Sequence, residues 1–161
     1  MSQPTLVDLP QPAVVIATKP GQVFVLDRCD GTPILPVTET PMPQDPEPYE
    51  HLSPTQPISA INLLPPNLTE KDMWGITPYD QLRCRILFRK TRYEGPYTPQ
   101  SQRGMLQYPG LMGVTEWGGV AVDEQSKVMV VNTSTVPYVL RLLAKEKAKD
   151  IQAKWQSERE T

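Results

Sequence analysis

Two short apolar runs separated by a four-residue turn constrain this chain more than any other feature. They occupy residues 14–18 and 23–27, and Lys19-Pro20-Gly21-Gln22 lies between them. A Cys29-Asp30-Gly31 turn follows, and a third run begins at residues 32–35. Strands of this length with Pro-Gly and Asp-Gly turns predict an antiparallel meander. Because one meander cannot bury both of its faces, it needs neighbouring sheets, and the tight spacing suits a blade of a β-propeller.

Prolines interrupt this pattern over residues 36–66. The chain has 19 prolines among 161 residues, and much of the excess above the usual share of about 5% falls in this stretch. Proline removes a backbone donor and biases its neighbour toward extended conformations. The stretch is therefore either a disordered linker or a long excursion packed over a larger body. Its buried-type residues favour the packed excursion: Ile58, Ile61, Leu63 and Leu64.

The remaining segments have readable periodicities. Asn67 or Thr69 can cap a single helical turn, and residues 79–89 alternate apolar with mainly basic side chains, which predicts a one-sided strand. Residues 116–123 and 128–132 are two β-type runs around a polar turn. In the tail, from residue 139 to 160, apolar side chains recur at three- and four-residue steps and predict an amphipathic helix: Leu140, Ala144, Ala148, Ile151 and Trp155.

Charge and composition exclude several classes of function. The net charge of −2 gives no electrostatic reason to expect nucleic acid as a partner. No window holds the roughly 20 apolar residues of a membrane span, and the first residues show no export signal. The sole histidine, His51, excludes a multi-histidine metal site. Cys29 and Cys84 lack a CxxC spacing, so free thiols are the commoner interpretation, and their pairing stays open.

Three polar or aromatic positions are candidates for a cofactor pocket at the rim of a sheet. Lys19 heads the first hairpin, Trp117 precedes two glycines, and Asn132 ends the last β-run. Each also has an ordinary interpretation, because a lysine before Pro-Gly is usually solvated and an asparagine at a strand end usually caps a turn. Trp74 and Trp117 can stack on a flat cofactor, although packing between blades is the more frequent use of tryptophan in such sheets.

Several motifs, in order, resemble the membrane-associated quinoprotein dehydrogenases, the group that includes glucose and quinate/shikimate dehydrogenases dependent on pyrroloquinoline quinone (PQQ). The resemblance covers about residues 3–143 and leaves out the helical tail from residue 144 to 161. It is carried by these segments: Gln3-Pro4-Thr5-Leu6, residues 19–28, Ser53-Pro54-Thr55-Gln56-Pro57, Asp72-Met73-Trp74-Gly75, Asp80-Gln81-Leu82 with Cys84-Arg85, Arg92-Tyr93-Glu94-Gly95 with Thr98-Pro99, Tyr108-Pro109-Gly110, Trp117-Gly118-Gly119, and Asn132.

The resemblance implies an all-β fold, a partial propeller of about two blades from an eight-bladed ring, with the Pro-rich stretch at 36–66 as a loop and a C-terminal helix. It implies two domains, the propeller part at 1–143 and the tail at 144–161. The intact family enzymes bind PQQ beside a calcium ion, oxidise a sugar or polyol, and pass electrons to ubiquinone at the periplasmic face of the inner membrane. Glucose is the first choice of substrate, and quinate or shikimate is the alternative.

Residue by residue, the resemblance gives Lys19 the catalytic role of the family lysine beside the quinone carbonyls, and Asn132 the role of an amide that hydrogen-bonds the quinone oxygens. Trp117 is a further candidate for cofactor contact. The family's general-base aspartate precedes the Gln3-Pro4 motif, and the calcium ligands lie in other blades, so we expect neither in this chain and no turnover from it alone. A non-catalytic module that pairs its strand edges with other propeller blades is the rival function.

Overall fold

The computed structural model describes residues 2–8, 10–48 and 50–157. Its largest sheet has four antiparallel strands in the order β1-β2-β3-β6, with β1 at Thr5–Asp8, β2 at Pro12–Ala17, β3 at Gln22–Asp27 and β6 at Ile61–Asn62. The predicted hairpin is β2–β3, in register from Ala13 opposite Asp27 to Ala17 opposite Val23. The run predicted at residues 32–35 forms only an isolated bridge between Leu26 and Pro33, so the expectation of a third strand there is wrong.

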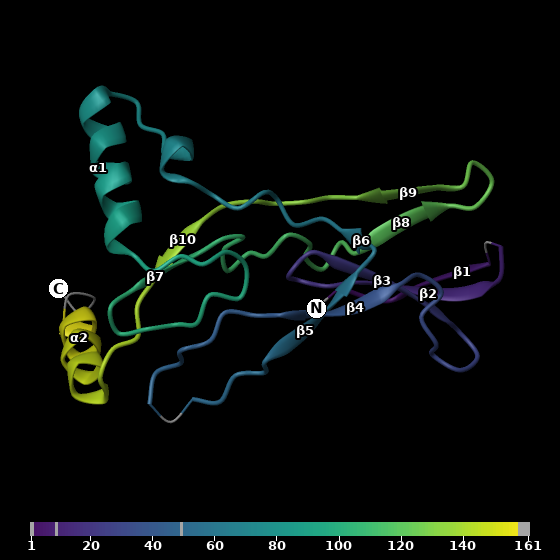
Figure 1. Cartoon of the computed structure of the whole chain (residues 1–161), viewed down its shortest axis with the longest axis horizontal. Coiled ribbons are helices and arrows are strands. Elements are labelled where there is room, and N and C mark those ends of the chain that lie inside the picture. Colours follow the sequence, from purple (N-terminus) through teal and green to yellow (C-terminus); the bar gives the residue numbers. More distant parts are fainter. Residues whose placement is uncertain (1, 9, 49, 158–161) are drawn as a thin grey trace.

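The hydrophobic core lies between this sheet and a second hairpin. That hairpin pairs β8 (Val120–Asp123) with β9 (Val128–Val131), as the sequence predicts. Alternate residues of β2 are buried, as expected of a strand with one face on a core. Figure 1 shows the β8–β9 hairpin beside the β1–β2–β3 sheet. The buried apolar cluster joins both elements: Val7, Ala13, Val15, Ala17, Val23 and Val120.

The proline-rich stretch is a packed excursion with its own hairpin. Strand β4 (Val37–Pro41) pairs antiparallel with β5 (Thr55–Ser59), and β6 then returns the chain to the main sheet. Buried Gln22, on β3, joins β5 and β6 to the main sheet. Its Oε1 accepts a 3.0 Å hydrogen bond from the Ser59 N–H, and its Nε2 donates one of 3.1 Å to Asn62 Oδ1. The ladder places prolines 41 and 57 on a two-stranded ribbon whose edges have no further strand partner among the described residues.

Residues 79–89 are helical, and the predicted one-sided strand is wrong. The helix α1 spans Pro78–Lys90 and follows the short 3₁₀ turn η1 at Glu70–Asp72, which Thr69 precedes as predicted. Thr77 caps α1: its side chain accepts from the Asp80 N–H, Asp80 reaches back to Thr77, and Pro78 occupies the first turn. These local contacts start a helix, whereas the apolar alternation has no sheet to join.

Two more strands and the tail complete the chain. Strand β7 (Met105–Gln107) pairs with β10 (Tyr138–Leu140), so Leu140 belongs to a strand and the tail helix α2 begins later, at Lys145–Ser157. Residues 158–161 of the predicted helix, and the side chain of Trp155, lie outside what the structure describes. In Figure 1 both helices lie at the end of the molecule opposite the tip of the β8–β9 hairpin. The division at residues 143 and 144 stays a prediction.

Candidate functional site

Lys19 stands on the tight turn that joins β2 to β3. The turn is closed by two backbone hydrogen bonds, from Thr18 N to Gln22 O at 2.9 Å and from Gly21 N to Thr18 O at 2.8 Å. The Lys19 side chain is 58% exposed. A strand pair therefore fixes the backbone of this lysine at the rim of the sheet and leaves its amine accessible.

Four consecutive residues far along the chain contact this turn. Val114 N donates to Lys19 O at 2.8 Å, and Thr115 Oγ1 donates to Thr18 O at 2.7 Å. The glycine before them, Gly113, lies so close that a Cβ there would stand 2.3 Å from Lys19 Cγ. Glu116 completes the set, with its Oε1 3.1 Å from Lys19 Nζ. The segment from Gly113 to Glu116 thus positions both the backbone and the amine of Lys19.

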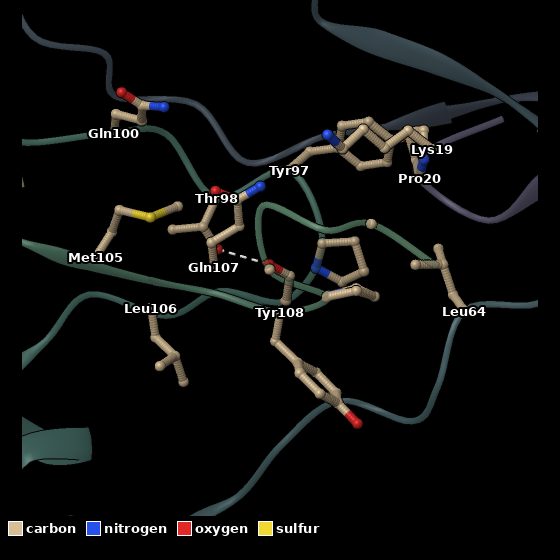
Figure 2. Close-up of a pocket in the computed structure, with 15 residues that line it drawn as sticks. Lys19, Pro20, Leu64, Tyr97, Thr98, Gln100, Met105, Leu106, Gln107 and Tyr108 are labelled. Carbon is tan, nitrogen blue, oxygen red and sulfur yellow. Dashed lines mark hydrogen bonds between the residues drawn. The ribbon is translucent and has the colours of Figure 1, made fainter. Parts of the chain in front are cut away.

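Lys19 lines a hollow of about 270 Å³. Figure 2 shows Lys19 and Pro20 at one end of it and Met105 at the other. Its lining is mostly apolar or aromatic and includes Tyr97, whose pKa is raised by burial, so the phenol stays neutral over the physiological range. The Lys19 side chain therefore lies partly in solvent and partly against a mostly apolar wall.

Asn132 lies in a second hollow, of about 370 Å³, with Glu116, Ala121 and Val130. It follows β9 and is exposed, and no other described residue hydrogen-bonds its side chain. Ser134 N donates to Val114 O at 2.8 Å, which joins the Asn132 segment to the one that holds Lys19. The structure therefore brings Lys19 and Asn132 to one region but places them in different hollows, and Glu116 is the link between them.

Trp117 is separate from both hollows. Its side chain is 81% exposed, and it is absent from the described lining of either one, although it directly follows Glu116. Trp74 is 72% exposed and belongs to the segment before α1. Cofactor stacking by Trp117 stays a prediction.

Sequence patterns did not indicate Gly113 and Glu116 as partners of Lys19. Contacts such as Thr115 to Thr18 join residues 97 positions apart, and no local periodicity reports such a pairing. The Glu116-Trp117-Gly118-Gly119 motif marks the right segment, but its glutamate reads equally well as an ordinary strand-start residue.

The donors at this site suit a quinone. Quinone carbonyl oxygens accept hydrogen bonds, and both the Lys19 ammonium and the Asn132 amide donate them from accessible positions. Over the described ranges, no group of three or more His, Cys, Asp or Glu side chains could hold a metal ion. Cys29 and Cys84 are both free thiols in the structure.

Comparisons with known proteins identify the family of the chain. All residues, 1–161, match the family model of the PQQ glucose/ethanol/alcohol dehydrogenase β-propeller domain. The chain is 48% identical over 149 residues to the quinoprotein glucose dehydrogenase of Gluconobacter oxydans, covering 88% of the chain and 18% of that protein. It is 44% identical over 160 residues to the glycerol dehydrogenase large subunit of the same organism, covering 93% and 22%.

A third relative is the quinate/shikimate dehydrogenase (quinone) of Acinetobacter baylyi, 41% identical over 157 residues, covering 92% of the chain and 19% of that protein. No solved structure matches the chain. The chain spans about a fifth of the length of these relatives. Its sheets are accordingly part of a β-propeller, and the chain belongs to the PQQ-dependent glucose/ethanol/alcohol dehydrogenase family.

Proposed function

We propose that the protein to which this chain contributes oxidises a sugar or polyol with PQQ as its cofactor and passes the electrons to ubiquinone. The observation that carries this proposal is the Lys19 ammonium, held at the sheet rim by four consecutive residues beside two hollows. Glucose is the first choice of substrate, because a glucose dehydrogenase shares 48% identity with the chain. Quinate or shikimate is the alternative, supported by a relative at 41%.

Lys19 and Asn132 have distinct proposed roles. PQQ, when bound beside these residues, would supply the acceptor for the hydride of the alcohol carbon. The Lys19 ammonium stabilises negative charge on a carbonyl oxygen beside it, and the Asn132 amide donates a second hydrogen bond to the same group. Neither side chain takes the hydroxyl proton of the substrate. We assign that step to an aspartate outside this chain, so the isolated chain binds cofactor at best and does not turn over.

The rest of the proposed enzyme lies in the remaining propeller blades. The outward face of the β8–β9 hairpin supports this, since Val130 is 63% exposed and Val128 48% exposed on a strand whose other face packs on the core. We place the calcium ligands and the substrate-selecting loops in those blades, at the periplasmic face of the inner membrane. None of the helices in the described residues has the length and apolar character to cross a bilayer.

The test is PQQ-dependent dye reduction by the full-length protein with glucose, glycerol and quinate as substrates. In that protein we expect Lys19→Ala to lower kcat by about 10²–10³-fold, while Lys149→Ala, on the exposed face of α2, leaves it unchanged. Absorbance titration of the isolated chain with PQQ measures cofactor binding separately. Full activity of Lys19→Ala would overturn the proposed role of Lys19. Substrate oxidation by the isolated, monomeric chain would overturn the proposal that this chain alone cannot turn over substrate.

A further inference from the structure

Glu116 occupies the boundary between the two hollows. It forms an ion pair with Lys19, which lines the first hollow, and itself lines the second hollow together with Asn132. We propose that Glu116 is a positioning residue whose carboxylate directs the Lys19 ammonium toward the Asn132 hollow. The expected effect of Glu116 on catalysis rests on the proposed function, but the orientation of the Lys19 ammonium by Glu116 does not.

The ion pair matters for orientation more than for stability. Lys19 is 58% exposed and Glu116 is 33% exposed, so water screens their attraction and the pair contributes little to folding. A lysine stem has four rotatable bonds, and a solvated lysine samples many rotamers. A carboxylate 3.1 Å from its Nζ selects those rotamers that point to one side.

Glu116 can select a direction because its own backbone is anchored. The two residues before it donate hydrogen bonds to the turn that bears Lys19, at 2.8 Å from Val114 and 2.7 Å from Thr115. Gly113 leaves room for the Lys19 stem that any side chain would remove. The same hydrogen bonds thus hold the backbones of Lys19 and Glu116 next to each other, and the fold sets the distance between these two backbone positions.

The carboxylate that holds the ammonium belongs to the Asn132 hollow. Lys19 lines the mostly apolar hollow of Tyr97 and Met105, and in the same structure its ammonium is paired with Glu116. Glu116 itself lines the wall that Asn132 shares. A ligand oxygen that needs both an ammonium and an amide donor requires this orientation. Glu116 therefore links the two candidate side chains that the structure places in separate hollows.

The test uses amine labelling of the cofactor-free chain, read peptide by peptide by mass spectrometry. We expect Glu116→Gln to raise the labelling rate of Lys19 several-fold, because the amine is released, and Glu116→Asp to give an intermediate rate. Glu146→Gln, on exposed α2, is the matched control and leaves the rate unchanged. An unchanged or slower rate in Glu116→Gln, with an unchanged unfolding midpoint, would overturn the inference.

A second readout separates this inference from the proposed function. In the full-length, PQQ-loaded protein, Glu116→Gln lowers kcat several-fold, leaves the substrate KM unchanged, and is partly rescued by Glu116→Asp. If Lys19→Ala keeps full activity while Glu116→Gln still raises the labelling rate of Lys19, the proposed function is wrong and the orientation of Lys19 by Glu116 is confirmed. If Lys19→Ala is inactive and Glu116→Gln changes neither labelling nor kcat, the positioning role fails and the proposed function stands.

Discussion

The N–H of Val114 donates a 2.8 Å hydrogen bond to the carbonyl oxygen of Lys19. The carbonyl of the same valine accepts one of 2.8 Å from Ser134, two residues beyond Asn132, and Val114 is only 1% exposed. One buried residue thus ties the turn of the candidate lysine to the segment of the candidate amide. Because these bonds involve backbone atoms, substitutions that shift the backbone should disturb both side chains together.

Gly113→Ala should displace the Lys19 turn. Gly113 has φ of +75°, and an added Cβ would stand 2.3 Å from Lys19 Cγ and 2.7 Å from Lys19 O. We expect a loss of at least about 2 kcal/mol in the free energy of unfolding, measured in urea. Gly31→Ala is the control, since its φ is +79° but its Cβ meets nothing within 4 Å. It should cost only the backbone strain, about 1 kcal/mol, and equal losses in the two variants would contradict the steric argument.

Gln22→Ala should detach the proline-rich excursion from the main sheet. Gln22 is 2% exposed, and its loss leaves the buried Ser59 N–H without its 3.0 Å acceptor. An unsatisfied buried donor costs about 1–3 kcal/mol. Hydrogen exchange of the Ser59 amide should accelerate, whereas Gln125→Ala, in an exposed turn, should leave it unchanged. Retained protection of Ser59 in Gln22→Ala would show that another group has replaced the acceptor.

Local patterns in the sequence predict the β2–β3 and β8–β9 hairpins, because a two-residue period and a tight turn are properties of adjacent residues. The same reasoning failed at residues 79–89. Apolar alternation over a few residues also fits a helix, and the decisive signal was the Thr77-Pro78-Tyr79-Asp80 start, where a capping threonine, a first-turn proline and a returning aspartate coincide.

Pairings between distant segments could not be predicted in this way. Strand β10 pairs with β7, and Glu116 with Lys19, across long stretches of intervening chain, so no pattern among neighbouring residues indicates either pairing. Their positions at a hairpin turn and a strand end, together with the family motifs, indicate Lys19 and Asn132 as candidates, but the separate hollows that they line depend on packing around Val114. Local sequence therefore predicts candidate side chains better than it predicts their mutual geometry.

Arg92→Ala should free the loop between β4 and β5. The Arg92 side chain is 16% exposed, and its guanidinium donates to the carbonyl oxygens of Gln44 at 2.6 Å and Asp45 at 2.7 Å. We expect a loss of about 2 kcal/mol and faster proteolysis within residues 42–53. Arg92→Lys should be intermediate, since an ammonium cannot match the planar fork. Exposed Arg103→Ala is the control, and equal proteolysis in wild type and Arg92→Ala would contradict the anchoring role.

Acid should release α1 from the η1 turn. Hydrogen bonding by Arg89, and then by Arg85, lowers the pKa of Glu70 below its ordinary 4.5. A lowered pKa in the folded state means that the ionised carboxylate stabilises the contact above pH 4.5, and that this is lost as the pH falls through the lowered value. Amide NMR shifts of α1 should therefore change on acidification. Glu70→Gln should show the acid-form shifts at pH 7, and Glu146→Gln should not.

Val130→Lys should weaken self-association of the isolated chain. On β9, Met129 and Val131 pack against the core cluster, whereas Val130 is 63% exposed and stands opposite Ala121 on the outer face. An apolar face on a two-stranded sheet attracts a second copy when its usual cover is missing, and a lysine there opposes edge and face pairing. We expect at least about a tenfold rise in the dissociation constant, measured by sedimentation, equivalent to roughly 1.4 kcal/mol. Ile76→Lys is the matched control, because Ile76 is 84% exposed but precedes α1. A similar loss of association in both variants would point to general solubility and not to the β8–β9 face.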